Sequence, residues 1–173
     1  MADVAKLEEP VIFIIDDDEA VRDSLRLLLE THGMEVEVYA STETFARSYR
    51  PRARQCLILD QHLRGMRTGL EFLASPERAA MRLPVILVTG RGDNEIKARA
   101  LDAGVAAYLD KPIDATQLVA TIDCAIAAAR ASGQVHHGVG SGALSRGDGR
   151  GGAEARRSPQ PVFVGIDHDN FGG

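Results

Sequence analysis

Short apolar runs alternate with longer stretches of helical periodicity between residues 11 and 130. Val11–Ile15 is apolar throughout, which is typical of a strand buried on both faces of a sheet. Leucines recur at helical spacing in residues 19–32, and Gly33 follows as a stop signal, so this stretch predicts an amphipathic helix. Residues 35–40 alternate between charged and apolar side chains, which predicts a strand at or near the sheet edge.

The same rhythm continues along the rest of this region. Three further apolar runs predict strands, at residues 56–59, 85–88 and 106–109. Helical patterns separate or follow these runs, at residues 41 to about 51, 70–74, 94–103 and 115–130. Five strand-helix units in succession predict an α/β fold with a flavodoxin-like, doubly wound, five-stranded parallel sheet and helices on both faces.

The composition changes abruptly after Ala131. Residues 131–173 hold 11 of the 17 glycines and lack amphipathic helical patterns. Such a segment buries too little apolar surface to offset its ordering entropy, so we expect it to be disordered. The predicted organisation is an N-terminal extension at residues 1–10, one domain at residues 11–130, and a flexible Gly-rich tail at residues 131–173 without an output domain.

Bulk composition narrows the classes of partner and compartment. The chain has 45% hydrophobic and 26% charged residues, as is usual for a soluble globular protein. A net charge of −5 provides no general attraction to nucleic acid or anionic lipid. We see no signal peptide and no apolar run long enough to span a membrane. Cys56 and Cys124 lie in apolar surroundings, which favours buried free thiols in a reducing cytoplasm.

Polar residues follow four of the predicted strands at their carboxyl ends: Asp16 and Asp17, then Asp60, Thr89 and Lys111. Each alone is weak evidence, since an aspartate run is usually a solvated loop and a lysine a surface charge. In a parallel sheet, however, the carboxyl ends of the strands meet at one edge, where ligands bind. Three carboxylates there would suit Mg²⁺, which prefers oxygen ligands. The pattern predicts a magnesium-assisted phosphoryl acceptor, with Asp60 as nucleophile and Lys111 neutralising the developing charge.

From Val11 to about Arg130 the chain resembles the response-regulator receiver domains of two-component signalling, in particular those of nitrogen-fixation-type regulators. The order and spacing of the matching motifs are highly specific. These motifs lie at residues 14–22, 57–60, 83–90 and 102–112.

The resemblance implies a role for each matching residue, all of them in phosphorylation or in the switch that follows it. The phosphoacceptor would be Asp60, and the metal ligands would be Asp16, Asp17, Asp60 and the backbone carbonyl of His62. The switch residues would be Thr89 and Tyr108, and Lys111 would pair with the phosphoryl group in addition to Thr89. The Lys111-Pro112 bond is expected to be cis. Asp18 matches a variable acidic position and is expected to begin a helix.

The function implied by the resemblance is that of a phosphorylated signalling module and not of a conventional enzyme. The expected donor is a histidine kinase or phosphotransfer protein, and the expected output is a downstream protein partner or a receiver homodimer. Residues after Arg130 cannot build a helix-turn-helix domain, so DNA binding is not expected. One alternative is a phosphorylation-independent pseudo-receiver. An aspartyl-phosphate hydrolase ranks last, because it needs an Asp-x-Asp pair and Gln61-His62 follow Asp60.

Overall fold

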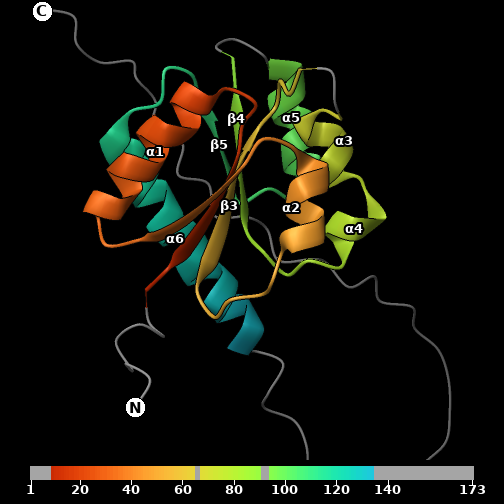
Figure 1. Cartoon of the computed structure of the whole chain (residues 1–173). Helices are drawn as coiled ribbons and strands as arrows, with labels where there is room; N and C mark the ends of the chain where they lie inside the picture. The colour runs from red at the N-terminus through yellow and green to blue at the C-terminus, as the bar shows by residue number, and fades with distance from the viewer. Residues whose placement is uncertain (1–8, 65–66, 91–93, 135–173) are drawn as a thin grey trace, which may run out of the picture.

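The computed structural model describes residues 9–64, 67–90 and 94–134, and within them one parallel sheet is covered by helices on both faces (Figure 1). The strand order is β2-β1-β3-β4-β5. The strands are β1 (Val11–Ile15), β2 (Glu35–Tyr39), β3 (Gln55–Asp60), β4 (Val85–Thr89) and β5 (Ala107–Asp110). The helices are α1 (Glu19–Thr31), α2 (Thr42–Ser48), α3 (Gly69–Leu73), α4 (Pro76–Ala79), α5 (Asn94–Asp102) and α6 (Ala115–Gln134).

The five predicted strands are confirmed, each within a residue at either end. The central strands β1, β3 and β4 are buried along their whole length, in keeping with their mostly apolar sequences. The alternating strand β2 lies at the sheet edge, as predicted, and is only partly buried. The doubly wound five-stranded fold expected from the sequence is therefore confirmed.

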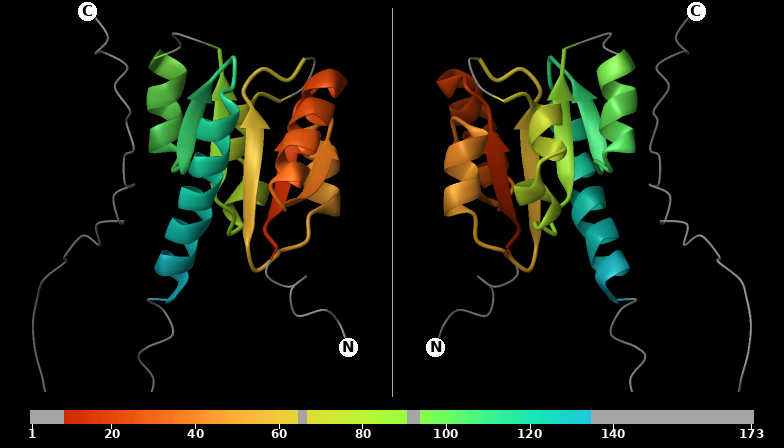
Figure 2. Two further views of the ribbon diagram at one scale, coloured as in Figure 1. Left: turned by 90° about the vertical axis from the view of Figure 1, so that its left-hand side faces the viewer. Right: turned by 90° about the vertical axis from the view of Figure 1, so that its right-hand side faces the viewer.

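Alternate residues of the strands supply two separate cores, because successive side chains point to opposite faces of a sheet. On one face, Phe13 of β1 packs against Phe45 of α2, and the same core includes Phe72 of α3 and Ala100 of α5. On the other face, neighbouring residues of the same strands pack with α1 and α6. Figure 2 shows the two helical layers on either side of the sheet.

Local signals explain where several helices begin and end. Asp18 caps α1, since its Oδ1 accepts from the backbone N–H of Ala20 at 2.9 Å, which confirms its expected place at a helix start. Gly33 follows α1 with a φ of 74°, a conformation that glycine adopts without strain. The helix α4 was not predicted, although Ser75-Pro76 provides an N-cap followed by proline at N1.

The last helix is longer than predicted. Its pattern indicated an end at Arg130, but α6 continues for four more residues, Ala131-Ser132-Gly133-Gln134. Twenty residues of helix span about 30 Å, and Figure 2 shows α6 projecting past the ends of the strands. The predicted tail beyond residue 134 and the N-terminal extension before residue 9 lie outside the described residues.

The two cysteines lie in different environments. Cys56 is buried in β3, as expected, but Cys124 is exposed, so its predicted burial was wrong. The reason is helical geometry. Ile122, Ala125 and Ile126 face the sheet, and Cys124 lies two residues after Ile122, on the opposite side of α6.

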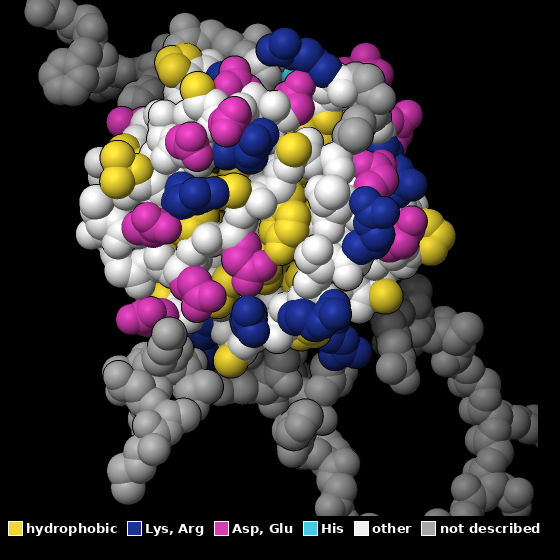
Figure 3. Space-filling model, in the orientation of Figure 1, with side chains coloured by type: hydrophobic (Ala, Val, Ile, Leu, Met, Phe, Trp, Pro, Cys, Tyr) yellow, Lys and Arg dark blue, Asp and Glu magenta, His cyan; other side chains and the backbone are white. Residues whose placement is uncertain are grey.

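Charges are interspersed over the surface. On the face shown in Figure 3, acidic and basic side chains alternate and do not form a large patch of one sign. No helix within residues 9–64, 67–90 and 94–134 combines the length and apolar character needed to cross a bilayer.

Candidate functional site

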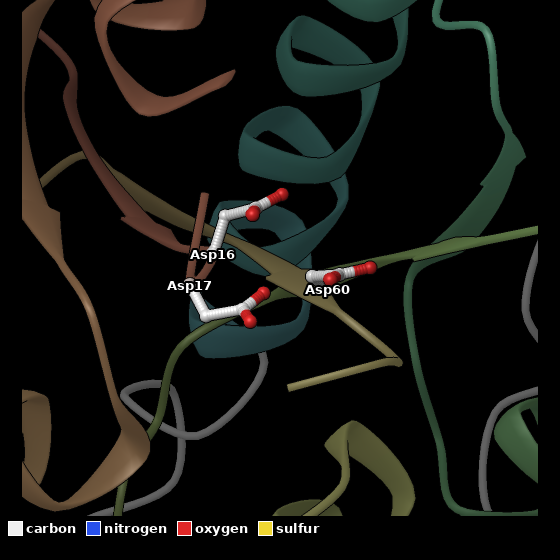
Figure 4. A group of neighbouring side chains, drawn as sticks. All are labelled: Asp16, Asp17 and Asp60. Carbon is white, nitrogen blue, oxygen red and sulfur yellow. The ribbon is translucent and has the colours of Figure 1, made fainter. Parts of the chain in front are cut away.

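The carboxyl ends of the central strands bring the predicted acidic residues together. Asp16 and Asp17 follow β1, and Asp60 ends β3, which pairs directly with β1. One carboxylate oxygen from each of the three lies within 4.8 Å of the others. Figure 4 shows the three side chains projecting into the same region. The adjacency predicted from the strand pattern is therefore confirmed for this cluster, which we call the acidic triad.

The acidic triad is mostly withdrawn from solvent. Asp16 and Asp60 are each 3% exposed, and Asp17 is partly buried. Oδ1 of Asp16 accepts a hydrogen bond from the backbone N–H of Asp18 at 2.9 Å. Burial of several like charges is unfavourable unless a cation or hydrogen-bond donors compensate.

Lys111 provides part of that compensation. Its Nζ lies 3.2 Å from Oδ1 of Asp60 and 3.5 Å from Oδ2 of Asp16. The contact with Asp60 is an ion pair without hydrogen-bond alignment, because the buried Oδ1 has no hydrogen-bond partner of ordinary geometry among the described residues. The ammonium is therefore close enough to neutralise Asp60, while Oδ1 keeps capacity for another ligand.

The pKa values of two groups follow from this arrangement. Burial raises the pKa of Asp16 above 3.8, and repulsion by Asp60 and Asp17 adds to the increase, although the Asp18 N–H and Lys111 oppose it. Burial lowers the pKa of Lys111, but attraction to Asp60 and Asp16 outweighs burial, and the net pKa is raised above 10.5. The triad thus holds excess negative charge that one lysine offsets only partly.

The donor set fits a hard divalent cation. The triad offers only carboxylate oxygens, which Mg²⁺ and similar ions prefer. Oδ1 of Asp60 is buried and has no hydrogen-bond partner within residues 9–64, 67–90 and 94–134. Arg64 partly competes for this site: its backbone N lies 3.2 Å and its Nε 3.4 Å from Oδ2 of Asp17. The triad could therefore hold a metal ion, with Asp17 changing partner when it does.

Thr89 ends β4, one residue beyond the position that pairs with Asp60. It is buried, and its hydroxyl donates to the carbonyl of Gly90 at 3.2 Å and to Oδ1 of Asp110 at 3.4 Å. Both distances are long for an O–H···O bond, so neither acceptor holds the hydroxyl strongly.

Tyr108 and His62 are the two remaining residues with predicted roles. Tyr108 lies on β5, is partly buried, and has Nζ of Lys97 5.1 Å from its ring centroid. His62 has an exposed side chain two residues after Asp60, and the metal role of its backbone carbonyl stays a prediction. The Lys111-Pro112 peptide is cis, as expected.

Two features near the site were not predicted from the sequence. Gly69 lies at the start of α3, where a Cβ would come within 2.9 Å of the backbone oxygen of Asp60, so the close approach requires glycine. Lys97 and Asp110 form an ion pair of 2.7 Å. Asp110 obeys the strand-end rule that identified Asp60, and this signal could have revealed it.

Comparison with known proteins agrees with this geometry. Residues 12–123 match the family model of the response regulator receiver domain. The chain is 35% identical over 111 residues to the transcriptional regulatory protein FixJ of Azorhizobium caulinodans, covering 64% of this chain and 52% of the relative. It is 32% identical over 118 residues to nodulation protein W of Bradyrhizobium diazoefficiens, covering 68% and 50%. The chain thus spans about half the length of these relatives.

Solved structures show the same similarity. The response regulator StyR superposes with a TM-score of 0.66 at 31% identity, covering 73% of this chain and 64% of that one. The structure titled FixJ-N superposes with a TM-score of 0.61 at 29% identity, covering 69% and 95%. With the family model matching more than half of its residues, the chain belongs to the response regulator receiver domain family of two-component signalling.

Proposed function

We propose that the protein accepts a phosphoryl group on Asp60 from the phosphohistidine of a histidine kinase or phosphotransfer protein, with Mg²⁺ as cofactor, and that it does so in the cytoplasm. The observation that carries the proposal is the position of Asp60. Its buried carboxylate lies beside two further acids and the Lys111 ammonium, and its Oδ1 accepts no hydrogen bond from the residues that the structure describes.

The chemistry follows from these groups. A carboxylate oxygen of Asp60 forms a bond to phosphorus while the P–N bond of the donor breaks, and the imidazole nitrogen keeps the electron pair and takes up a proton. Lys111 neutralises negative charge on the phosphoryl oxygens from its position beside Asp60. Asp16, Asp17, Asp60 and, by resemblance, the carbonyl of His62 would hold a cation, which would supply further charge neutralisation.

The output of this site is a change of surface. Phosphorylation replaces the single negative charge of the Asp60 carboxylate with a phosphoryl group that carries about 1.5 to 2 negative charges and three acceptor oxygens. These oxygens compete for the Thr89 hydroxyl. Movement of Thr89 and Tyr108 then changes the surface formed by α5, β5 and α6. A downstream protein or a second receiver would bind this surface, so the protein acts as a switch and not as a conventional enzyme.

Labelling with a small phosphodonor and Mg²⁺ tests the proposal. The intact mass of the wild-type protein should gain one phosphoryl group, and Asp60→Asn should gain none. Asp18→Asn is the matched control, because asparagine caps a helix as well as aspartate and Asp18 lies outside the triad. Equal labelling of Asp60→Asn and wild type would refute the assignment.

The contact of Arg64 with Asp17 favours one alternative, a phosphorylation-independent pseudo-receiver, because an arginine here replaces part of the charge that a metal would supply. Magnesium binding separates the two functions. A phosphorylatable receiver should bind Mg²⁺ and become more stable, and Arg64→Ala should strengthen this binding. A pseudo-receiver should show no stabilisation by Mg²⁺ in either protein.

A further inference from the structure

Lys97 occupies an unusual place for a lysine. It lies three residues before Ala100, the fully buried residue of α5, and therefore on the face of the helix that covers the sheet. Its side chain is only 14% exposed. An ammonium in such surroundings is unfavourable unless an acid and hydrogen bonds compensate it.

Asp110 is the compensating acid. Nζ of Lys97 donates to its Oδ2 at 2.7 Å, the length of a strong charge-assisted hydrogen bond. The same Nζ lies over the ring of Tyr108, 5.1 Å from its centroid and within the range of a cation–π interaction. One lysine of α5 therefore binds both Asp110 and Tyr108 of β5.

The second oxygen of Asp110 extends this group to the phosphorylation site. Asp110 is the register partner of Thr89 across β4 and β5, and its Oδ1 accepts from the Thr89 hydroxyl at 3.4 Å. A hydroxyl has one proton to donate. Thr89 must therefore leave Asp110 and the Gly90 carbonyl when it donates to a phosphoryl group on Asp60.

We propose that the Lys97–Asp110 ion pair favours the unphosphorylated arrangement of Thr89 and Tyr108, so that both members are positioning residues that oppose the switch. The inference rests on the proposed phosphorylation of Asp60. Lys97 orients the carboxylate that accepts from Thr89 and also occupies the space over the Tyr108 ring. Removal of the ion pair releases both switch residues and favours the phosphorylated arrangement.

Beryllofluoride with Mg²⁺ is a suitable probe, because it binds an aspartate carboxylate as a stable analogue of the phosphoryl group. Its Kd is measured by ¹⁹F NMR for the full chain and for four variants. Asp110→Ala removes the acceptor and the ion pair, and Lys97→Gln removes the charge. The other two variants are controls. Lys97→Arg keeps the positive charge at this position, and Arg52→Gln breaks an unrelated ion pair of 3.2 Å with Glu37.

Asp110→Ala and Lys97→Gln should each tighten beryllofluoride binding by about two- to tenfold, the factor expected for one ordinary hydrogen bond. Because the Thr89 contact is long, values near the lower end are expected. Lys97→Arg and Arg52→Gln should bind as the wild type does. The Tyr108 ring resonances of Asp110→Ala without ligand should shift toward those of the beryllofluoride-bound wild type.

Circular dichroism and thermal unfolding identify any variant that fails to fold, and Lys97→Gln provides a second test if Asp110→Ala does. If folded Asp110→Ala and Lys97→Gln bind beryllofluoride as the wild type does, or more weakly, the role of the ion pair is overturned. The proposed function would stand, because beryllofluoride binding by the wild type would still support phosphorylation at Asp60. A wild-type protein that neither binds beryllofluoride nor accepts a phosphoryl group would overturn the proposed function and this inference with it.

Discussion

Gly69 provides the sharpest structural test of how the fold holds Asp60 in place. A Cβ at this position would lie 2.9 Å from the backbone oxygen of Asp60, 2.9 Å from Cδ1 of Leu87 and 3.1 Å from Cα of Gln61. Two of these three neighbours are backbone atoms of the strand end that carries the phosphoacceptor. Gly69→Ala therefore requires α3 or β3 to shift.

The size of the effect follows from opposing contributions. Overpacking of a close-packed interior costs about 1–3 kcal/mol, whereas replacing glycine by alanine in a helix gains up to about 1 kcal/mol. The gain is smaller at the first position of α3, so Gly69→Ala should lower the free energy of unfolding by about 1–2 kcal/mol. Because Asp60 moves with its carbonyl, phosphorylation of this variant should also be slower than that of the wild type.

Gly90→Ala is the matched control. Gly90 also lies beside the site, but a Cβ there would meet no atom of the described residues within 4 Å, and its backbone is not in the left-handed region. This variant should stay within about 0.5 kcal/mol of the wild type or be slightly more stable. Urea unfolding followed by circular dichroism measures both variants. If Gly69→Ala proves as stable as Gly90→Ala, the proposed packing of α3 against Asp60 is wrong.

Three further predictions concern the charges and thiols. Because the pKa of Asp16 is raised, Asp16→Asn should stabilise the metal-free protein at neutral pH. This gain in the free energy of unfolding should be absent below about pH 3.8 and should grow as the pH rises through the raised pKa, which urea unfolding at a series of pH values measures. Lys111→Met should lower the free energy of unfolding by about 1–3 kcal/mol, between the contributions of exposed and buried ion pairs. Calorimetric titration should nevertheless show tighter Mg²⁺ binding, because the triad loses its neighbouring cation, and weaker binding would contradict the account of the site. Cys124 should react with a thiol reagent in the native protein. Cys56 should react only after unfolding, because burial shields its thiol and raises its pKa to about 12, and equal reaction rates of the two thiols would disprove the difference in burial.

The acidic triad could be predicted because two strong local signals coincide. Strands such as Val11–Ile15 are buried on both faces and are apolar throughout, so their limits are visible in the sequence. A polar residue directly after such a strand must lie at the carboxyl end of the sheet, however the helices pack. Asp16 and Asp60 satisfy this rule, and their adjacency then needs only the pairing of β1 with β3.

The features that escaped prediction depend on rotation and packing of helices. Lys97 meets Asp110 because α5 turns that side chain toward the sheet, and the spacing of 13 residues between them carries no periodic signal. Cys124 has apolar neighbours in sequence but faces outward, since helical rotation separates adjacent residues. The close contact at Gly69 is set by the approach of α3 to β3, which no local pattern encodes.

The edge strand β2 has a consequence for self-association. Within the described part of the chain no strand pairs with its outer edge, and proteins limit the liability of such an edge with charged side chains. Glu35 is exposed and Glu37 partly exposed on this strand, and Glu37 is fixed by Arg52 at 3.2 Å and by the hydroxyl of Tyr39 at 2.7 Å. Two copies joined at this edge would bring glutamates of both chains close together, so carboxylate repulsion opposes open-ended growth of the sheet.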